Sequence, residues 1–120
     1  MTDSDVPVFD TAHFADVCGD DLAFQREIIG DFLSQFDSRL EDIAAALVLR
    51  DPAAIRLAAH ALKGSAASLG ARALAEAAHR IEDLGRSKSL DDAPSELDRV
   101  LAEAGRLRGT LATYLRERAA

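Results

Sequence analysis

The middle of the chain holds a histidine, a lysine and a glycine at helical spacing. Lys63 follows His60 by three residues, and Gly64 comes next. Residues three or four positions apart on a helix are neighbours on its surface. An imidazole in water is mostly neutral at cytoplasmic pH and is then a nucleophile, while a lysine ammonium stabilises the charge on phosphoryl oxygens. A histidine nucleophile with a lysine one turn away is therefore suited to chemistry on a phosphoryl group.

Gly64 is the unusual member of this set. A glycine inside a helix costs about 1 kcal/mol relative to alanine, yet the surrounding segment uses alanine freely. We interpret the missing methyl group as clearance for a phosphoryl group and for the protein that carries it. Apolar residues of this segment lie on the side of the helix away from His60, so the imidazole is expected to face solvent. These residues are Ile55, Ala58, Ala59, Leu62, Ala66 and Leu69.

Five helices are expected to position these residues, because apolar side chains recur every three or four residues along most of the chain. The helix that carries His60 is expected to begin at Pro52, with Asp51 as its N-cap, and to end at Gly70. A short first helix is expected to have Asp10 as its N-cap. The predicted ranges are 9–17, 20–50, 52–69, 71–85 and a last helix that opens at 94.

The predicted fold class is all-α. Amphipathic helices joined by short connections pack antiparallel and bury their apolar faces together, which gives an up-down-up-down four-helix bundle with a short additional N-terminal helix. A chain of 120 residues is expected to form a single domain, residues 1–120. The predicted core includes one stripe on the second helix, formed by Phe24, Ile28, Phe32, Phe36, Leu40, Ile43 and Leu47, and one on the last helix, formed by Leu97, Val100, Leu101, Ala104, Leu107, Leu111 and Leu115.

The composition argues against disulfide-bonded, thiolate zinc-binding, secreted and membrane-spanning proteins. Cys18 is the single cysteine, so neither an internal disulfide nor a thiolate cluster for zinc is available. The first ten residues are acidic and lack the basic and apolar regions of a secretory signal, and no apolar run approaches the roughly 20 residues of a membrane span. We therefore expect a cytoplasmic protein that does not associate with membranes.

Charge is unevenly distributed along the chain. The formal net charge is −7, which disfavours nucleic acid as a partner because its phosphates would be repelled. Residues 1–51 contain twelve acidic and three basic residues, whereas residues 52–86 contain three acidic and five basic residues. The segment around His60 is therefore the part of the chain best suited to an anion.

The same segment resembles a known family. The run HALKGSAASLGA from His60 to Ala71, followed by Leu74 and by Ile81 and Glu82, resembles the signature of the histidine-containing phosphotransfer (HPt) domains of multistep two-component phosphorelays. The resemblance covers about residues 55–86. It implies that His60 is phosphorylated, that Lys63 assists and that Gly64 keeps the site open. It also implies that the partners are receiver domains of response regulators or hybrid histidine kinases, which exchange the phosphoryl group between an aspartate and His60.

Glu82 stands where many members of this family have a Gln or Glu that contacts the histidine ring. We hypothesise that its carboxylate accepts a hydrogen bond from Nδ1 of His60 and leaves Nε2 as the nucleophile. The alternative is an ordinary surface acid paired with Arg86 at i+4. Five further residues near His60 are candidates for docking a receiver: Arg56, Leu57, Ala61, Ala67 and Ser68.

No glycine-rich loop precedes Lys63, so the chain is expected to be a phosphocarrier without ATP-binding or kinase machinery, and not an enzyme. We expect a monomer that binds no cofactor or metal, with Mg²⁺ supplied by the receiver. Two other functions stay open. One is a helical adaptor that binds partners without phosphohistidine, and the other is a metal-binding bundle that uses His60, His79 and Glu82. Otherwise His79 is interpreted as a boundary residue of its helix and His13 as a surface residue.

Overall fold

The computed structural model describes residues 6–120, which form five α-helices and no strand. This confirms the predicted all-α class. Residues 1–5 of the predicted single domain lie outside the described residues. The helices are α1 (Thr11–Cys18), α2 (Leu22–Leu49), α3 (Pro52–Leu69), α4 (Arg72–Ser87) and α5 (Ala93–Ala119).

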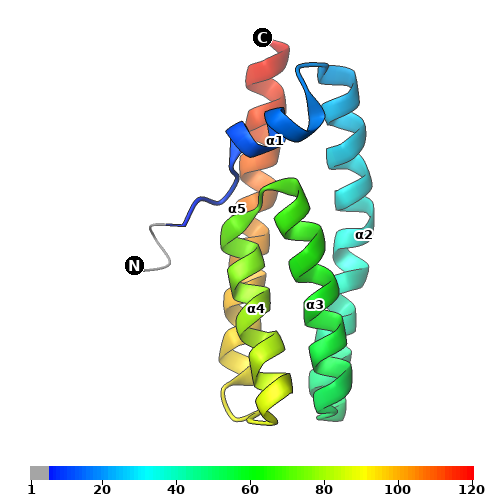
Figure 1. The fold of residues 1–120 in the computed structure, drawn as a ribbon, viewed down its shortest axis with the longest axis vertical. Coiled ribbons are helices and arrows are strands. Elements are labelled where there is room, and N and C mark those ends of the chain that lie inside the picture. The colour runs from blue at the N-terminus through cyan, green and yellow to red at the C-terminus, as the bar shows by residue number, and fades with distance from the viewer. Residues whose placement is uncertain (1–5) are drawn as a thin grey trace.

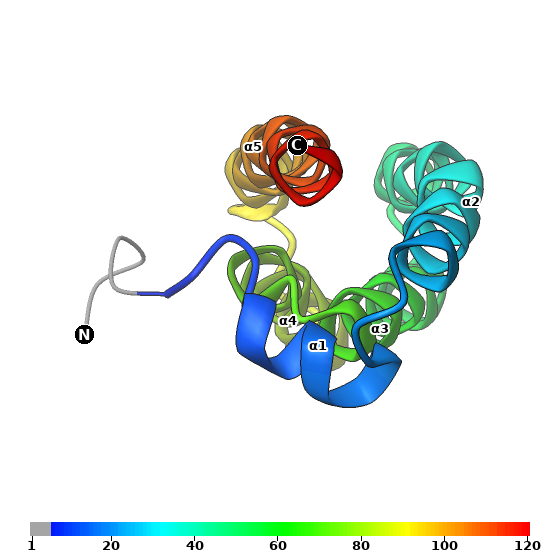
Figure 2. The same cartoon turned by 90° about the horizontal axis from the view of Figure 1, so that it is seen from above.

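Four long helices lie side by side along the long axis of the molecule. Figure 1 shows that α2, α3, α4 and α5 alternate in direction, and that the short α1 lies near the end where α2 begins and α5 finishes. Viewed from above, the four helices surround a common centre, with α3 between α2 and α4 (Figure 2). Helix α3 packs against α2 and α4, and α5 packs against the same two helices. Helix α3 is therefore held from both sides.

No helix within residues 6–120 combines the length and the apolar composition that crossing a membrane requires.

Local signals set the ends of the helix that carries His60. The Asp51 side chain accepts hydrogen bonds from the backbone N–H groups of the first turn of α3, and Pro52 occupies the first helical position. Such a cap stabilises a helix by about 1 kcal/mol. Gly70 ends α3 in the left-handed conformation with φ of +92°, and its carbonyl accepts a hydrogen bond from the backbone N–H of Asp10 at 2.8 Å. The position of His60 along α3 therefore follows from its immediate sequence, as predicted.

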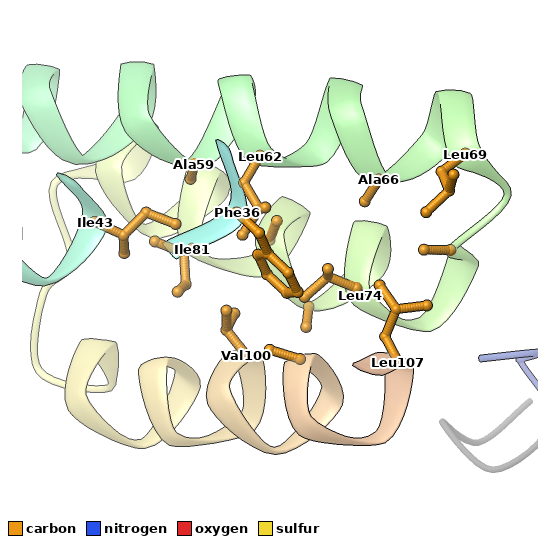
Figure 3. Close-up of a cluster of buried hydrophobic side chains, with 14 of the residues drawn as sticks. Phe36, Ile43, Ala59, Leu62, Ala66, Leu69, Leu74, Ile81, Val100 and Leu107 are labelled. Carbon is orange, nitrogen blue, oxygen red and sulfur yellow. The ribbon is translucent and has the colours of Figure 1, made fainter. Parts of the chain in front are cut away.

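The core lies between the facing sides of the long helices (Figure 3). Burying a leucine or isoleucine side chain stabilises the fold by about 1.5 to 3 kcal/mol. Because α3 turns one face into this core, its opposite face is left for solvent and partners. The buried residues of α3 are Ile55, Ala59, Leu62, Ala66 and Leu69, those of α4 include Leu74, Ala77, Ala78 and Ile81, and those of α5 include Val100, Ala104, Leu107 and Leu111.

The predicted core stripe of α2 is wrong at its first turn. Phe24 is 43% exposed, and the neighbouring Gln25 is buried in its place. The amide of Gln25 is satisfied on both sides: Nε2 donates to the carbonyl of Gly19 at 2.6 Å, and Oε1 accepts from the hydroxyl of Tyr114 at 2.9 Å. A buried polar group needs such partners. Sequence periodicity counts only apolar residues, so it selected Phe24 and missed Gln25.

The predicted core stripe of α5 is wrong at one residue. Leu101 was expected in the core but is exposed, whereas its neighbour Val100 is fully buried. Both residues fall within the apolar pattern of the sequence. The rotation of α5 against α2 and α4 decides which of them faces inward.

Gly85 was expected to end the fourth helix, but α4 continues to Ser87 and Gly85 is buried. A Cβ atom at Gly85 would lie 2.8 Å from the carbonyl oxygen of Pro52 and 2.9 Å from the backbone nitrogen of Arg56. Both atoms belong to the backbone of α3 and have little room to move. Gly85 therefore permits α4 to approach the first turns of α3 closely.

We expect Gly85→Ala to lower the free energy of unfolding by about 1 to 3 kcal/mol, because the added methyl group forces the two helices apart. The control is Gly109→Ala in α5, where an added Cβ would have nothing within 4 Å. That substitution should raise stability by about 0.5 to 1 kcal/mol through helix propensity alone. Urea unfolding followed by circular dichroism measures both. Equal stability changes in the two variants would contradict the close contact.

Candidate functional site

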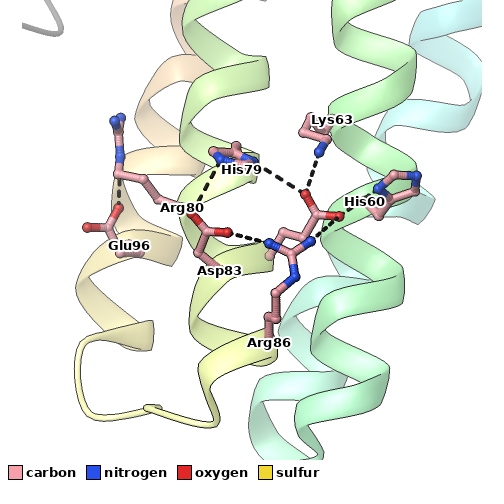
Figure 4. Close-up of polar contacts among 8 residues, drawn as sticks. His60, Lys63, His79, Arg80, Asp83, Arg86 and Glu96 are labelled. Carbon is pink, nitrogen blue, oxygen red and sulfur yellow. Dashed lines mark hydrogen bonds and ion pairs between the residues drawn. The ribbon is translucent and has the colours of Figure 1, made fainter.

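His60 lies on the outward face of α3 with its imidazole largely in solvent. Its side chain is 66% exposed, and its Nδ1 atom lies 2.6 Å from Oε2 of Glu82 on α4 (Figure 4). Within residues 6–120 no hydrogen-bond partner contacts Nε2. One ring nitrogen is therefore held by the protein while the other is available to a reactant.

Glu82 is the buried group that connects the two helices. The residue is only 2% exposed, and its Oε1 atom accepts a hydrogen bond from Nζ of Lys63 at 2.5 Å. Arg86 approaches the other oxygen at 3.7 Å. The alternative interpretation of Glu82 as a surface acid is wrong, because the carboxylate is buried and contacts both His60 and Lys63 of α3. The i+4 pairing with Arg86 that it assumed is present.

The environment of Glu82 keeps it ionised. Burial alone would raise the pKa of its carboxyl group, but the hydrogen bonds from Lys63 and His60, the charge of Lys63 and the contact with His79 together lower this pKa from 4.5 to about 2. An ionised carboxylate only accepts hydrogen bonds. Nδ1 of His60 is then the donor, so the neutral ring carries its proton on Nδ1 and its lone pair on Nε2.

Gly64 faces solvent one turn beyond His60. Apart from its chain neighbours and the nearby backbone of α3, a Cβ atom placed there would have no atom of the described residues within 4 Å, so packing does not require a glycine at this position. A groove of about 440 Å³ begins at this point between α3 and α4. It is lined by Lys63, Gly64, Ala67, Ala75, Glu76, His79 and Arg80.

A second groove flanks α3 on the side of α1 and α2, with a volume of about 250 Å³. Val17 and Phe24 line it and are both exposed, which leaves apolar surface close to the helix of His60. The lining residues are Val17, Cys18, Phe24, Ile28, Phe32, Ser65, Ser68 and Leu69. The outward face of α3 therefore lies between two grooves, one that has several charged side chains among its lining residues and one lined mostly by apolar residues.

A family model described as the Hpt domain matches residues 27–113 of the chain, a range that contains α3, α4, His60 and Glu82. The chain belongs to the Hpt domain family. Hpt domains are histidine phosphotransfer modules of phosphorelays, and they are phosphocarriers rather than kinases. His60, Lys63, Gly64 and Glu82 thus all lie within the part of the chain that matches the Hpt domain.

The fold is shared with a known Hpt protein. The crystal structure of histidine-containing phosphotransfer protein B (HptB) from Pseudomonas aeruginosa PAO1 superimposes with a TM-score of 0.85. The match covers 92% of this chain and 96% of that one, with 24% sequence identity. A comparison with curated protein sequences gave no match.

Four of the predicted site residues of this Hpt domain lie together: His60, Lys63 and Gly64 on α3, and Glu82 on α4. The five docking candidates all lie on α3. Arg56, Leu57, Ala67 and Ser68 are exposed, while Ala61 is half-buried beside His60.

Sequence reasoning missed the contact that His79 makes with the site. Its Nδ1 atom lies 3.4 Å from Oε1 of Glu82, three residues ahead on α4. The i,i+3 spacing of His79 and Glu82 already indicated that they could be in contact, but the contact is important only because Glu82 is buried. The metal-site hypothesis that joined His60, His79 and Glu82 finds no support, since no group of three or more His, Cys, Asp or Glu among the described residues is arranged to hold an ion.

The lowered pKa of Glu82 predicts a pH-dependent stability. A carboxyl group with a depressed pKa stabilises the fold above its unfolded value of 4.5, and this contribution is lost as the pH falls through about 2. We expect the native protein to lose up to about 3 kcal/mol from this group over that range, and Glu82→Gln to lack that part of the loss. Urea titrations from about pH 6 to pH 2 measure it. Asp83→Asn, which alters an exposed neighbour, is the control, and parallel profiles for Glu82→Gln and the native protein would contradict the prediction.

Proposed function

We propose that this Hpt domain is a phosphorelay intermediate that accepts a phosphoryl group on His60 from the aspartate of one receiver domain and donates it to another. The observation that carries the proposal is the exposed imidazole whose Nδ1 is held by a buried, ionised Glu82. That contact directs the lone pair of Nε2 away from the protein, toward a docked partner.

The proposed step needs no general base. The lone pair of Nε2 forms the N–P bond, the bond between phosphorus and the aspartate oxygen breaks, and the aspartate carboxylate leaves with the electron pair. The ring keeps its proton on Nδ1 and gains positive charge, which faces the Glu82 carboxylate. Lys63 is close enough to place its ammonium beside the phosphoryl oxygens, where it stabilises their charge. The reverse step returns the group to a receiver by the same path.

The proposal also covers the oligomeric state of the chain, its location and the source of its Mg²⁺ and phosphoryl groups. The chain is a single-domain monomer in the cytoplasm that binds no cofactor, and the receiver supplies Mg²⁺ through its own oxygen ligands. The antiparallel four-helix bundle, with the short N-terminal helix at one end, serves as a rigid support for α3. Phosphoryl groups come from a phosphorylated partner, in keeping with the family's role as phosphocarriers rather than kinases.

Receiver domains of response regulators or hybrid histidine kinases dock over α3. Exposed apolar surface near the reactive group favours this face, since such patches mark sites of protein contact. Leu57 is exposed one turn before His60, and Val17 and Phe24 are exposed beside the apolar groove. The docking residues are Arg56, Leu57, Ala61, Ala67 and Ser68.

Incubation with a receiver domain charged as its acyl phosphate tests the function. We expect an acid-labile, base-stable phosphoprotein, no label on His60→Gln, and full label on the control variant His13→Gln, which removes an exposed histidine on α1. Absence of label with several receivers would favour the binding-only adaptor. Stoichiometric zinc at neutral pH, measured by calorimetry, would favour the metal-binding bundle.

Gly64→Ala should separate stability from activity. Because an added Cβ meets nothing within 4 Å, we expect the free energy of unfolding to rise by about 1 kcal/mol. Transfer from a receiver should slow by about tenfold, because the methyl group lies where the partner approaches. Gly105→Ala on α5, also without neighbours within 4 Å, should give the same stabilisation with unchanged transfer. Stopped-flow transfer kinetics and urea unfolding provide the two measurements, and an unchanged rate for Gly64→Ala would rule out the clearance role.

A further inference from the structure

His79 is a titratable group of this site to which the proposed transfer step assigns no role. It lies on α4, and its side chain is half-exposed at 50% (Figure 4). One ring nitrogen, Nδ1, is 3.4 Å from Oε1 of Glu82, and the other, Nε2, is 3.3 Å from Oδ2 of Asp83. Lys63 donates to that same Oε1 atom at 2.5 Å. The lysine of one helix and the histidine of another therefore share one oxygen of the buried carboxylate.

The position of His79 beside Oε1 of Glu82 matters because the ammonium of Lys63 is needed in two places. In the structure it is hydrogen-bonded to Glu82, whereas in the transfer step it is needed at the phosphoryl group on Nε2 of His60. Glu82 is 2% exposed, so water cannot readily replace a donor that leaves it. A buried carboxylate that loses a charged partner is strongly destabilised. Moving Lys63 is therefore costly unless another donor takes its place.

We propose that His79 is a positioning residue that replaces Lys63 on Glu82 when Lys63 turns to the phosphoryl group on His60. The inference rests on the proposed function of His60. The distance of 3.4 Å is longer than an ordinary N–H···O hydrogen bond, so His79 is near Oε1 without being its principal donor. A small rotation of its half-exposed side chain brings it into hydrogen-bonding distance when Lys63 leaves.

The protonated ring of His79 is the effective form. A neutral imidazole donates from one nitrogen only, whereas an imidazolium donates to Glu82 and Asp83 at once. Acidification favours the imidazolium, so the replacement should work better at lower pH. The charged groups around His79 are Lys63 from α3, Glu76, Arg80, Glu82, Asp83 and Arg86 from α4, and Glu96 of α5, which pairs with Arg80. Arg86 pairs with both carboxylates that His79 faces, at 3.7 Å from Oε2 of Glu82 and 2.8 Å from Oδ1 of Asp83.

Phosphoramidate tests the proposal without any receiver. Nε2 of His60 forms a bond to phosphorus while the P–N bond of phosphoramidate, whose nitrogen is already protonated, breaks. The nitrogen takes the electron pair of that bond and leaves as ammonia. We expect His79→Ala to slow this reaction by about fivefold near pH 6 and by less than about twofold near pH 8. His79→Lys, which keeps a cation, should restore the rate and remove the pH-dependent difference. His13→Ala is the matched control and should follow the native profile.

A double substitution shows whether His79 acts through Lys63. Once Lys63→Met has removed the ammonium, His79→Ala should cause no further loss of rate. An equal loss in both backgrounds, an unchanged rate in His79→Ala, or a loss independent of pH would each overturn the proposal. Circular dichroism and urea unfolding confirm that the variants fold.

The experiments can distinguish a failure of the proposal for His79 from a failure of the proposed relay function. If receivers fail to exchange with the native protein while phosphoramidate labels His60, the relay function is wrong and the effect of His79 is still decided by its pH profile. If phosphoramidate labels no histidine of the native protein, the proposal for His79 fails together with the assignment of His60.

Discussion

The buried carboxylate of Glu82 is the interaction on which the site depends. An ionised group with 2% exposure is tolerated only when donors compensate for the water it has lost, and here the donors come from two helices. His60 and Lys63 reach it from α3, at 2.6 and 2.5 Å, while His79 lies beside it on α4. The contacts that keep Glu82 ionised also orient the imidazole. Glu82 therefore contributes both to the packing of α3 against α4 and to the orientation of the reactive imidazole.

Close packing of α3 against α4 makes this arrangement possible. Both helices bury small residues, among them Ala59 on α3 and Ala77 and Ala78 on α4, all fully buried. Gly85 extends the close packing to the backbone of the first turns of α3. The distance between helix axes depends on the side chains at their contact, so small residues bring the axes together. At this separation a glutamate on one helix reaches a histidine on the other directly.

The two remaining long helices serve a different purpose. Helices α2 and α5 close the core on the inner side of α3 and α4, and the hydrogen bond between Tyr114 and Gln25 joins them near the end where α1 lies. This leaves the outer face of α3 uncovered, with Gly64 beside the imidazole and exposed apolar residues such as Phe24 nearby. An inner face built for packing and an outer face open to a partner suit a module that hands on a chemical group.

The sequence by itself determined the features that depend on neighbours along the chain. Asp51 and Gly70 bound α3 through local hydrogen bonds and backbone conformation, and the apolar period placed His60, Lys63 and Gly64 on one outward face. Tertiary structure decided what depends on how helices rotate against one another: Glu82 is buried rather than exposed, and Phe24 is exposed rather than buried. The contact of His79 with Glu82 joins neighbours on one helix, but the burial of Glu82 that makes the contact important was decided by tertiary structure. Periodicity defines a face only to within about one residue, and the partner helix selects which residue turns inward.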